Sequence, residues 1–147
     1  MRFGVVIDAQ APDGVRAFAA RAEALGFDSL WASDHPLISG VGCFSALTLA
    51  AGTTRAVRLG TCVACVYYWN PVVLARAAAD VDRVSGGRLV LGLGRGDHPR
   101  EFAWLGLRFP PARERARALA EALRIVRPLL AGETVTVEGQ QFRAEGA

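Results

Sequence analysis

The sequence has 147 residues, of which 52% are hydrophobic and 21% charged, so it contains enough apolar material to bury the core of one domain. Its formal charge is +3, and every cation is arginine because the chain contains no lysine. The densest basic stretch, Arg113 to Arg117, is interrupted by Glu114 and has no interleaved aromatic residues, which disfavours nucleic-acid binding. No apolar run approaches the roughly 18 residues of a membrane span, and no signal-peptide pattern opens the chain. We therefore expect a cytoplasmic protein with neither a membrane nor a nucleic acid as partner.

The three cysteines do not indicate a disulfide or a metal site. Cys62 and Cys65 lie three positions apart in a strand-like run, where side-chain alternation points them to opposite faces. A structural zinc site needs a second pair of ligands at matching spacing, and the sequence offers none.

The first third of the chain predicts two strand-helix units. Residues 2–9 form a strand-like run, and Pro12 opens a helix whose apolar positions repeat at helical spacing until Gly26 ends it. Residues 28–34 predict a second strand, which is followed by a loop containing Pro and Gly and then by a short helix over 45–54.

The third unit begins with a strand over residues 57–65. Asn70 then supplies a helix cap and Pro71 the first helical residue, ahead of a helix over 72–84. The sequence Ser-Gly-Gly at 85–87 predicts the end of this helix.

Residues 88–94 predict a fourth strand whose continuous apolar run is typical of a strand buried on both faces. A loop with two prolines leads to a helix over 112–131, and residues 134–142 predict a short excursion that forms a hairpin around Glu138-Gly139. One side of the long helix is predicted to be its apolar face, formed by Leu119, Leu123, Val126 and Leu130.

Strict alternation of strands and helices predicts a parallel sheet with right-handed crossovers, either doubly wound or an eight-fold barrel. Four units suffice for the first architecture but supply only half of the second, since a TIM barrel needs roughly 250 residues.

Ionisable side chains follow two of the predicted strands. Asp34 and His35 end the second strand, and Asp97, His98 and Glu101 follow the fourth. The carboxyl ends of parallel strands build the active site of an α/β barrel, and an imidazole there can hold or deliver a proton near neutral pH. These residues are candidates for proton transfer, although solvated loop charges would give the same pattern.

The glycine-rich run at 92–96 does not fit a nucleotide-binding fingerprint. Asp97 stands where a third glycine belongs, and Pro99 is expected to interrupt any immediate helix. The glycines either let the backbone approach a planar ligand or form a plain turn. Cys62 and Val63, at the end of the third strand, similarly predict either a bulge that backs a cofactor or ordinary core packing.

Motifs in a specific order and spacing run along almost the whole chain. They are residues 26–31, Ser33-Asp34-His35, 58–63, Asn70-Pro71, Ala75-Arg76, Asp82, 85–88, 91–94, Glu101-Phe102, Glu121 and Gly139. In this order they resemble the bacterial luciferase-like monooxygenase family of flavin- or F420-dependent oxidoreductases. The resemblance implies a (β/α)8 TIM barrel of which about the first four βα units are present, with residues 1–147 forming the N-terminal half of the barrel domain.

The resemblance also implies a cofactor. The Ser-Asp-His ending of the second strand is similar to the branch of the family that uses the deazaflavin coenzyme F420, whereas the flavin monooxygenases tend to carry Glu-His there. By this resemblance Asp34 contacts the cofactor and His35 lies in the active site. The expected activity is hydride transfer between F420 and a small organic substrate, by a protein that is a homodimer when complete.

Further site residues follow from the same resemblance. Cys62 and Val63 match a bulge with a non-prolyl cis peptide that backs the ring system, and Arg95 and Gly96 lie beside that ring. Asp97 falls where some relatives have a glutamate proposed as a proton donor. The phosphate-binding elements of such enzymes lie in the second half of the barrel, which this sequence does not contain.

Three alternatives stay open. The nearest is an FMN-dependent monooxygenase that uses molecular oxygen, and the next is a non-catalytic subunit or truncated remnant. A metal-dependent hydrolase is the third, with Asp34, His35, Asp97 and His98 as ligands.

Overall fold

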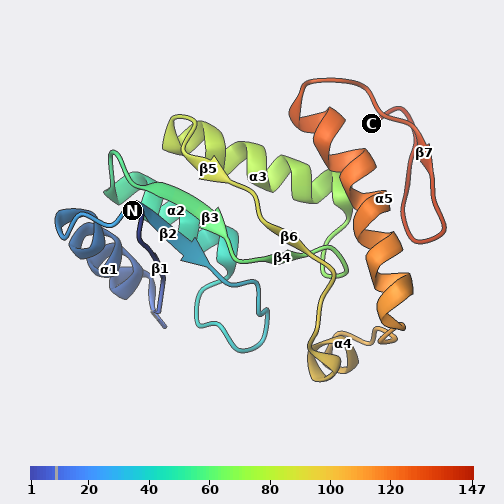
Figure 1. The fold of residues 1–147 in the computed structure, drawn as a ribbon, viewed down its shortest axis with the longest axis horizontal. Coiled ribbons are helices and arrows are strands. Elements are labelled where there is room, and N and C mark those ends of the chain that lie inside the picture. The colour runs from blue at the N-terminus through green and yellow to red at the C-terminus, as the bar shows by residue number, and fades with distance from the viewer. Residues whose placement is uncertain (9) are drawn as a thin grey trace. The chain divides into compact units, whose positions relative to one another are not determined.

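The computed structural model describes residues 1–8 and 10–147. The chain forms two compact units, which are treated separately below. The first unit comprises Met1–Ala64 and Asp80–Gly92, and the second comprises Cys65–Ala79 and Leu93–Ala147. Figure 1 shows the order of the elements along the chain. Ala9, the last residue of the first predicted strand, lies outside the described residues.

The first unit is built on a parallel sheet, as the alternation of elements predicts. Its four strands are hydrogen-bonded in the order β1, β2, β3 and β5. Their bounds are Gly4–Val6, Ser29–Ala32, Arg58–Thr61 and Leu89–Val90. Leu30 of β2 pairs with Val5 on one side and with Leu59 on the other, so neighbouring strands run in the same direction.

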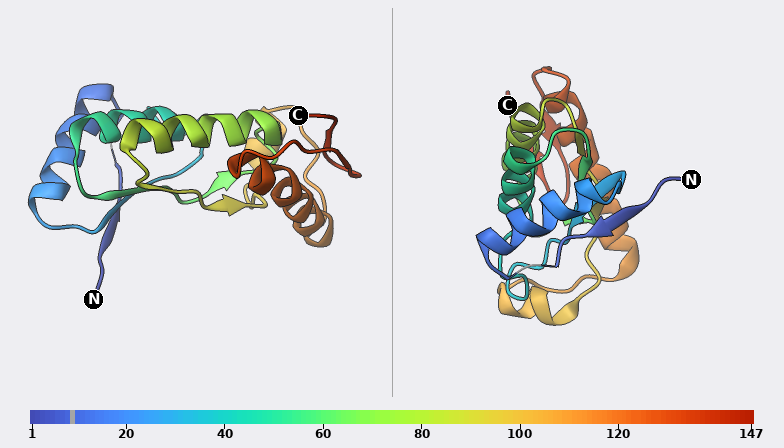
Figure 2. Two further views of the ribbon diagram at one scale, coloured as in Figure 1. Left: turned by 90° about the horizontal axis from the view of Figure 1, so that it is seen from above. Right: turned by 90° about the vertical axis from the view of Figure 1, so that its left-hand side faces the viewer.

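Two helices, α1 (Pro12–Ala24) and α2 (Cys43–Thr53), cover one face of this sheet (Figure 2). Leu30 and Leu59 are fully buried beneath them. Helix α1 ends as predicted, because Gly26 adopts a positive φ of 82° that other residues rarely take. Helix α2 begins at Cys43 rather than at Ser45, since Cys43 and Phe44 are also buried and extend its apolar face.

The opposite face of the sheet carries Trp31, whose indole lies over two glycines. A Cβ atom at Gly60 would lie 2.4 Å from the indole ring, and one at Gly4 would lie 2.5 Å from its Nε1 atom. The same Nε1 donates a hydrogen bond of 2.9 Å to Ser29 Oγ. Glycine at both positions is therefore what leaves room for the ring.

Polar contacts stabilise the first unit at the end of the sheet where β3 and β5 begin. The Arg88 guanidinium donates to the main-chain oxygens of Ala51, Thr54 and Val57 at 2.8–3.1 Å. The Glu23 carboxylate accepts the backbone N–H groups of residues 55–57 at 2.7–3.0 Å. Partial burial opposes ionisation of Glu23, but these donors lower its pKa on balance.

The third and fourth predicted strands are each divided in two. Strand β3 ends at Thr61 and β4 covers Ala64–Cys65, while β5 ends at Val90 and β6 covers Leu93–Gly94. Between the two halves, the Thr61 hydroxyl donates to the Gly92 carbonyl at 2.7 Å and accepts the Gly92 N–H at 2.9 Å. The Thr61 side chain here takes the place of backbone hydrogen bonds between the strands. Alternation of apolar residues in the sequence does not reveal such a break.

The prediction that the fourth strand is buried on both faces is wrong. Residues 88–94 are all only half-buried. Within the described residues β5 has one hydrogen-bonded neighbour, β3, so it forms an edge of the sheet. An edge strand keeps part of its apolar surface exposed even where its sequence is continuously apolar.

Helix α3 (Pro71–Ser85) begins as predicted. Asn70 Oδ1 accepts the N–H of Val72 at 2.9 Å, and Pro71 is the first helical residue. The two glycines that follow it have φ angles of 72° and 81°, which end the helix. The boundary between the units falls within this helix, after Ala79.

The second unit also contains two helices and a hairpin. They are α4 (Pro99–Trp104), α5 (Ala112–Leu130), β7 (Val137–Glu138) and β8 (Arg143–Ala144). The antiparallel pairing of β7 with β8 confirms the predicted hairpin, but its turn spans Gly139 to Phe142 rather than centring on Glu138-Gly139. The predicted loop after the fourth strand contains α4, because Pro99 occupies the first helical position, where proline is tolerated, instead of breaking a helix.

The predicted apolar face of α5 is wrong for most of its residues. Leu123 and Leu130 are 37% and 44% exposed, and Leu119 is only half-buried. The buried residues of the helix are instead Arg115, Ala118, Ala122, Ile125 and Val126. Ile125 packs in a cluster with residues of the hairpin, Val135, Val137 and Ala144. The buried face of α5 therefore includes small alanines, whereas the prediction had assigned the larger leucines to it.

Candidate active site at the strand ends

A cavity of about 250 Å³ lies in the first unit where β1 and β2 end. Its walls come from the ends of these two strands, from the loop that follows β2 and from α2. The lining residues are Val6, Ile7, Asp8, Gln10, Ala32, Ser33, His35, Ile38, Ser39, Gly40, Val41 and Ala46. The half-buried His35 imidazole is thus at a cavity beyond the carboxyl end of a parallel strand, where α/β barrels place their chemistry.

The loop after β2 turns back on itself directly beyond His35. The His35 carbonyl accepts the N–H groups of Ile38 and Ser39 at 3.2 and 3.0 Å. Further along this loop, Gly40 packs against Gln10, which precedes α1. A Cβ atom at Gly40 would lie 2.4 Å from the carbonyl oxygen of Gln10. Glycine is therefore needed for the loop to close this side of the cavity.

Asp34 lies two residues beyond the end of β2 and next to His35 in the sequence. Only 8% of Asp34 is exposed, and it is absent from the lining of the cavity. Its Oδ1 atom accepts a hydrogen bond from the Cys43 thiol, with a sulfur–oxygen distance of 3.5 Å. Burial, together with the nearby Asp34 charge, raises the pKa of Cys43, so the thiol keeps its proton and acts as a donor.

Cys62 and Val63 lie at the end of the adjacent strand. The peptide bond between them is cis, which confirms the predicted isomer of this bond. Cys62 N–H donates to the Ala32 carbonyl at 2.8 Å, so the ends of β2 and β3 lie side by side. Both side chains are exposed, Val63 by 45%. The first unit therefore brings together the strand ends that carry His35 and Cys62-Val63.

The other predicted site residues, Arg95, Gly96 and Asp97, belong to the second unit. Gly96 has a positive φ of 72°, and a Cβ atom there would lie 2.7 Å from the Phe102 ring. The Arg95 guanidinium donates to the Ala112 carbonyl at 3.2 Å, and Asp97 is exposed.

Arg115 is a residue of this segment that the sequence analysis missed. It is 9% exposed, its Nε donates to the Gly96 carbonyl at 3.0 Å, and its guanidinium also donates to the Pro110 carbonyl. The guanidinium lies 4.0 Å above the centre of the Phe109 ring. Its spacing of three and seven residues from the buried Ala118 and Ala122 is the signal that could have identified it. Arg115 holds the loop that carries Arg95 to Asp97.

Glu101 is not a solvated loop charge, which is the alternative that the sequence pattern left open. It lies on α4, is 1% exposed, and accepts the Tyr68 hydroxyl at Oε2 over 2.8 Å. Burial and this bond raise the pKa of Tyr68, which keeps its proton. Both side chains pack beside Phe102, whose ring centroid is 5.6 Å from that of Tyr68. Glu101 therefore belongs to the interior of the second unit.

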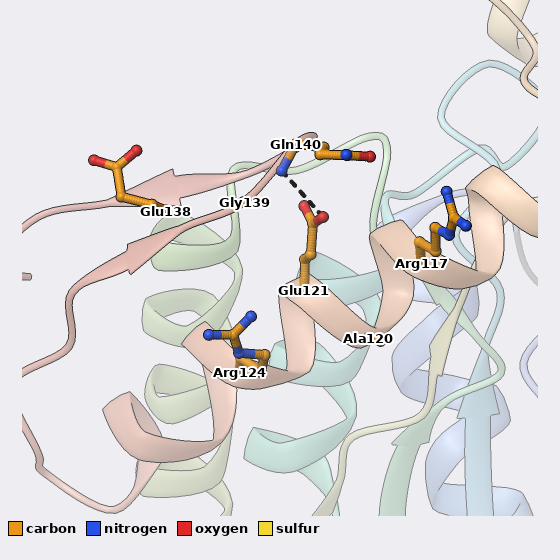
Figure 3. A pocket seen from close by; sticks show the side chains of 7 residues that line it. All are labelled: Arg117, Ala120, Glu121, Arg124, Glu138, Gly139 and Gln140. Carbon is orange, nitrogen blue, oxygen red and sulfur yellow. Dashed lines mark hydrogen bonds between the residues drawn. The ribbon is translucent and has the colours of Figure 1, made fainter.

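A second concavity, of about 620 Å³, lies between α5 and the hairpin. Figure 3 shows Glu121 pointing from α5 toward the hairpin turn, with Arg117 and Arg124 on the same helix. The Glu121 carboxylate accepts the N–H groups of residues 140–142 at 2.8–3.1 Å. Despite partial burial, these donors lower the pKa of Glu121. The charge at the centre of this concavity thus serves to hold the hairpin.

Three structural findings bear on the alternatives. All three cysteines are free. Within residues 1–8 and 10–147, no group of three or more His, Cys, Asp or Glu side chains is arranged to hold a metal ion. In that same part of the chain, no helix is both long enough and apolar enough to cross a membrane.

Parallel βα units with ionisable groups beyond the strand ends are the arrangement of part of an α/β barrel. The model of the luciferase-like monooxygenase family matches residues 1–147. The chain belongs to this family of oxidoreductases.

Individual relatives agree with this assignment. The chain is 37% identical over 144 residues to an F420-dependent glucose-6-phosphate dehydrogenase of Kineococcus radiotolerans, covering 93% of this chain and 42% of that protein. It is 36% identical to a 5,10-methylenetetrahydromethanopterin reductase of Archaeoglobus fulgidus, covering 86% and 36% of the two chains. The structure of a coenzyme F420 dependent tetrahydromethanopterin reductase from Methanopyrus kandleri superposes with a TM-score of 0.85 at 28% identity, covering 100% and 44%. The chain thus spans less than half the length of each of these relatives.

Proposed function

We propose that the chain forms the N-terminal half of a luciferase-like barrel that transfers a hydride between coenzyme F420 and a small organic substrate. The observation that carries the proposal is the pair of neighbouring strand ends in the first unit. One presents His35 to a cavity, and the next presents Cys62 and Val63 across a cis peptide. The family membership and the F420-dependent relatives support the choice of cofactor.

The side chains at these strand ends fit a planar deazaflavin ring. Val63 offers an exposed apolar surface, and a Cβ atom on the neighbouring Gly92 would lie 2.3 Å from the Thr61 carbonyl oxygen. The backbones of the two segments are therefore packed flush, and the apolar Val63 side chain stands out from them. Such a surface can support one face of an aromatic ring. Bound F420 would supply the two-electron hydride acceptor or donor.

Within this arrangement we assign the proton to His35. When an alcohol is oxidised to a carbonyl compound, its carbon loses a hydride and its oxygen loses a proton. An imidazole nitrogen of His35 would accept that proton, and it would return a proton to the oxygen when the reaction runs in reverse. The cavity beside His35 would hold the part of the substrate nearest the reacting carbon.

The roles of the remaining candidates are part of the same proposal. Arg95 and Gly96 would lie beside the ring system, with Arg115 fixing their loop through the Gly96 carbonyl. Asp97 would be a second carrier of protons, and Asp34 would bind the cofactor.

A flavin-dependent monooxygenase is the second candidate, because the family model is described as that of luciferase-like monooxygenases. This candidate keeps Cys62 and Val63 as the support of the ring but would use reduced FMN in place of F420 and molecular oxygen as a co-substrate.

Titration of the full-length protein with F420 and with FMN, followed by absorbance and fluorescence, separates the candidates. Binding of F420 in preference to FMN, together with substrate-dependent bleaching of its absorbance, is the expected result. Preferential binding of FMN would replace the proposal by the monooxygenase. Binding of neither cofactor would favour a non-catalytic role.

A further inference from the structure

We infer that the contact between Asp34 and Cys43 is a latch that positions His35 by closing the loop between β2 and α2. The inference rests on the proposed function insofar as it gives His35 a role in proton transfer. It adds support of its neighbour His35 to the cofactor contact proposed for Asp34.

The latch joins the two ends of the loop. Asp34 lies two residues beyond the end of β2, and Cys43 is the first residue of α2. Their side chains meet at 3.5 Å across nine positions of sequence, with the thiol as donor and the carboxylate as acceptor. Both residues are nearly inaccessible, at 8% and 3% exposure, so water does not compete with the bond.

The segment between these ends forms a large part of the cavity wall. It contributes His35, Ile38, Ser39, Gly40 and Val41 to the lining. Inside the loop, the turn at His35 is held by two backbone hydrogen bonds, and Gly40 is packed against Gln10. The Asp34–Cys43 bond closes the loop at its base. Fixing the base restricts the backbone of His35, which is the neighbour of Asp34, and with it the direction of the imidazole.

The two neighbours differ in burial and in contacts. Asp34 is buried and accepts the Cys43 thiol at the start of α2, whereas His35 is half-buried and lines the cavity. Because the two residues share a peptide bond, a restraint on Asp34 also limits the backbone of His35.

The first test is independent of any cofactor and uses NMR of the full-length protein labelled at histidine. The His35 signal is assigned as the one lost in His35→Ala, and the His98 signal as the one lost in His98→Gln. Cys43→Ala should shift and broaden the His35 ring signal and leave the His98 signal in place, and Cys43→Ser should restore the His35 signal because a hydroxyl again donates to Asp34. An unchanged His35 signal in Cys43→Ala would overturn the inference.

The second test is a double-mutant cycle on turnover. Loss of one hydrogen bond to a buried carboxylate predicts that Cys43→Ala lowers kcat roughly fivefold, and Cys43→Ser should recover most of it. In a His35→Ala background the same change should alter kcat by about twofold or less, because the two residues act together. An equal loss in both backgrounds would show that Cys43 does not act through His35.

Two controls keep the outcome decisive. Thr48→Ala removes a hydroxyl from the exposed side of the same helix and should leave the His35 signal and kcat unchanged. If Cys43→Ala does not fold, Asp34→Asn breaks the same latch at its other end while keeping the side-chain shape, and the same shift of the His35 signal is expected. If the wild-type protein binds neither F420 nor FMN, the proposed function fails, while the NMR result still decides whether the latch exists.

Discussion

The two units of this chain use charged and polar side chains in different ways. In the first unit, Arg88 and Glu23 fix the loops at one end of the sheet, and the other end leaves His35, Cys62 and Val63 accessible. In the second unit, the buried Arg115 donates a hydrogen bond to a loop carbonyl, and the buried Glu101 accepts one from Tyr68. The buried charges thus support the fold, whereas the half-buried imidazole beside a cavity is the candidate for proton transfer.

Replacement of His35 should have the largest effect on activity and would test this contrast most directly. In the full-length protein, His35→Ala is expected to lower kcat roughly 100-fold, as for the loss of a proton-transfer group, with little change in cofactor affinity. Steady-state kinetics and a binding titration measure the two effects separately. The matched change in the second unit, at the exposed His98, should alter kcat by about twofold or less. A similar loss at both histidines would remove the distinction between the units.

Arg115 should have the largest effect on stability. Arg115→Ala leaves the carbonyls of Gly96 and Pro110 without their donor and removes the cation from the Phe109 ring, so we expect a loss of about 3 kcal/mol in the free energy of unfolding. Chemical denaturation measures the loss. The exposed neighbour Arg113 provides the control, since its replacement by alanine should change stability by about 0.5 kcal/mol or less. Equal effects at the two arginines would contradict the structural role of Arg115.

A smaller effect is expected where the hairpin meets α5. Gly139→Ala would place a Cβ atom 2.5 Å from the Glu121 carboxylate and 2.6 Å from the Phe142 carbonyl, so the turn must move and stability should fall by about 1–2 kcal/mol. Gly52→Ala is the matched control, because it lies in α2 with open space around it and should gain about 0.5–1 kcal/mol from helix propensity. Thermal unfolding of both variants measures the difference in sign. Destabilisation by Gly52→Ala as large as that by Gly139→Ala would refute the steric explanation.

The smallest effect concerns pH, and it compares the glutamates that hold a loop in each unit. The pKa values of Glu23 and Glu121 are lowered from 4.5 in the folded chain, because the backbone donors outweigh partial burial. A carboxyl with a lowered pKa contributes stability above its ordinary pKa and loses it as the pH falls through the folded value. Stability should therefore decline below about pH 4.5, and Glu23→Gln and Glu121→Gln should each reduce the slope of this decline. Unfolding curves from pH 6 to pH 3 measure it, and slopes identical to that of the wild type would contradict the assignment.

Sequence patterns were sufficient to predict the order of the elements, the parallel sheet and the family. These features depend on local signals: helical and strand periodicity, the Asn70-Pro71 start of α3 and the glycines that end it. The motif at Cys62-Val63 likewise predicted the cis peptide that the structure contains. Such signals are contained in a few neighbouring residues, so they can be recognised without knowing what packs against them.

Which side chains are internal depends on packing between elements, which the sequence patterns did not reveal. The face of α5 depends on the hairpin that packs against it, so Ala118 and Ala122 are buried while the larger Leu123 is exposed. The sequence placed Asp34 and His35 together as neighbours, and the structure gives them different contacts, because Asp34 accepts the Cys43 thiol while His35 lines the cavity. Contacts between residues far apart in sequence have no local signature, since their strength depends on burial and distance that exist only after the chain has folded.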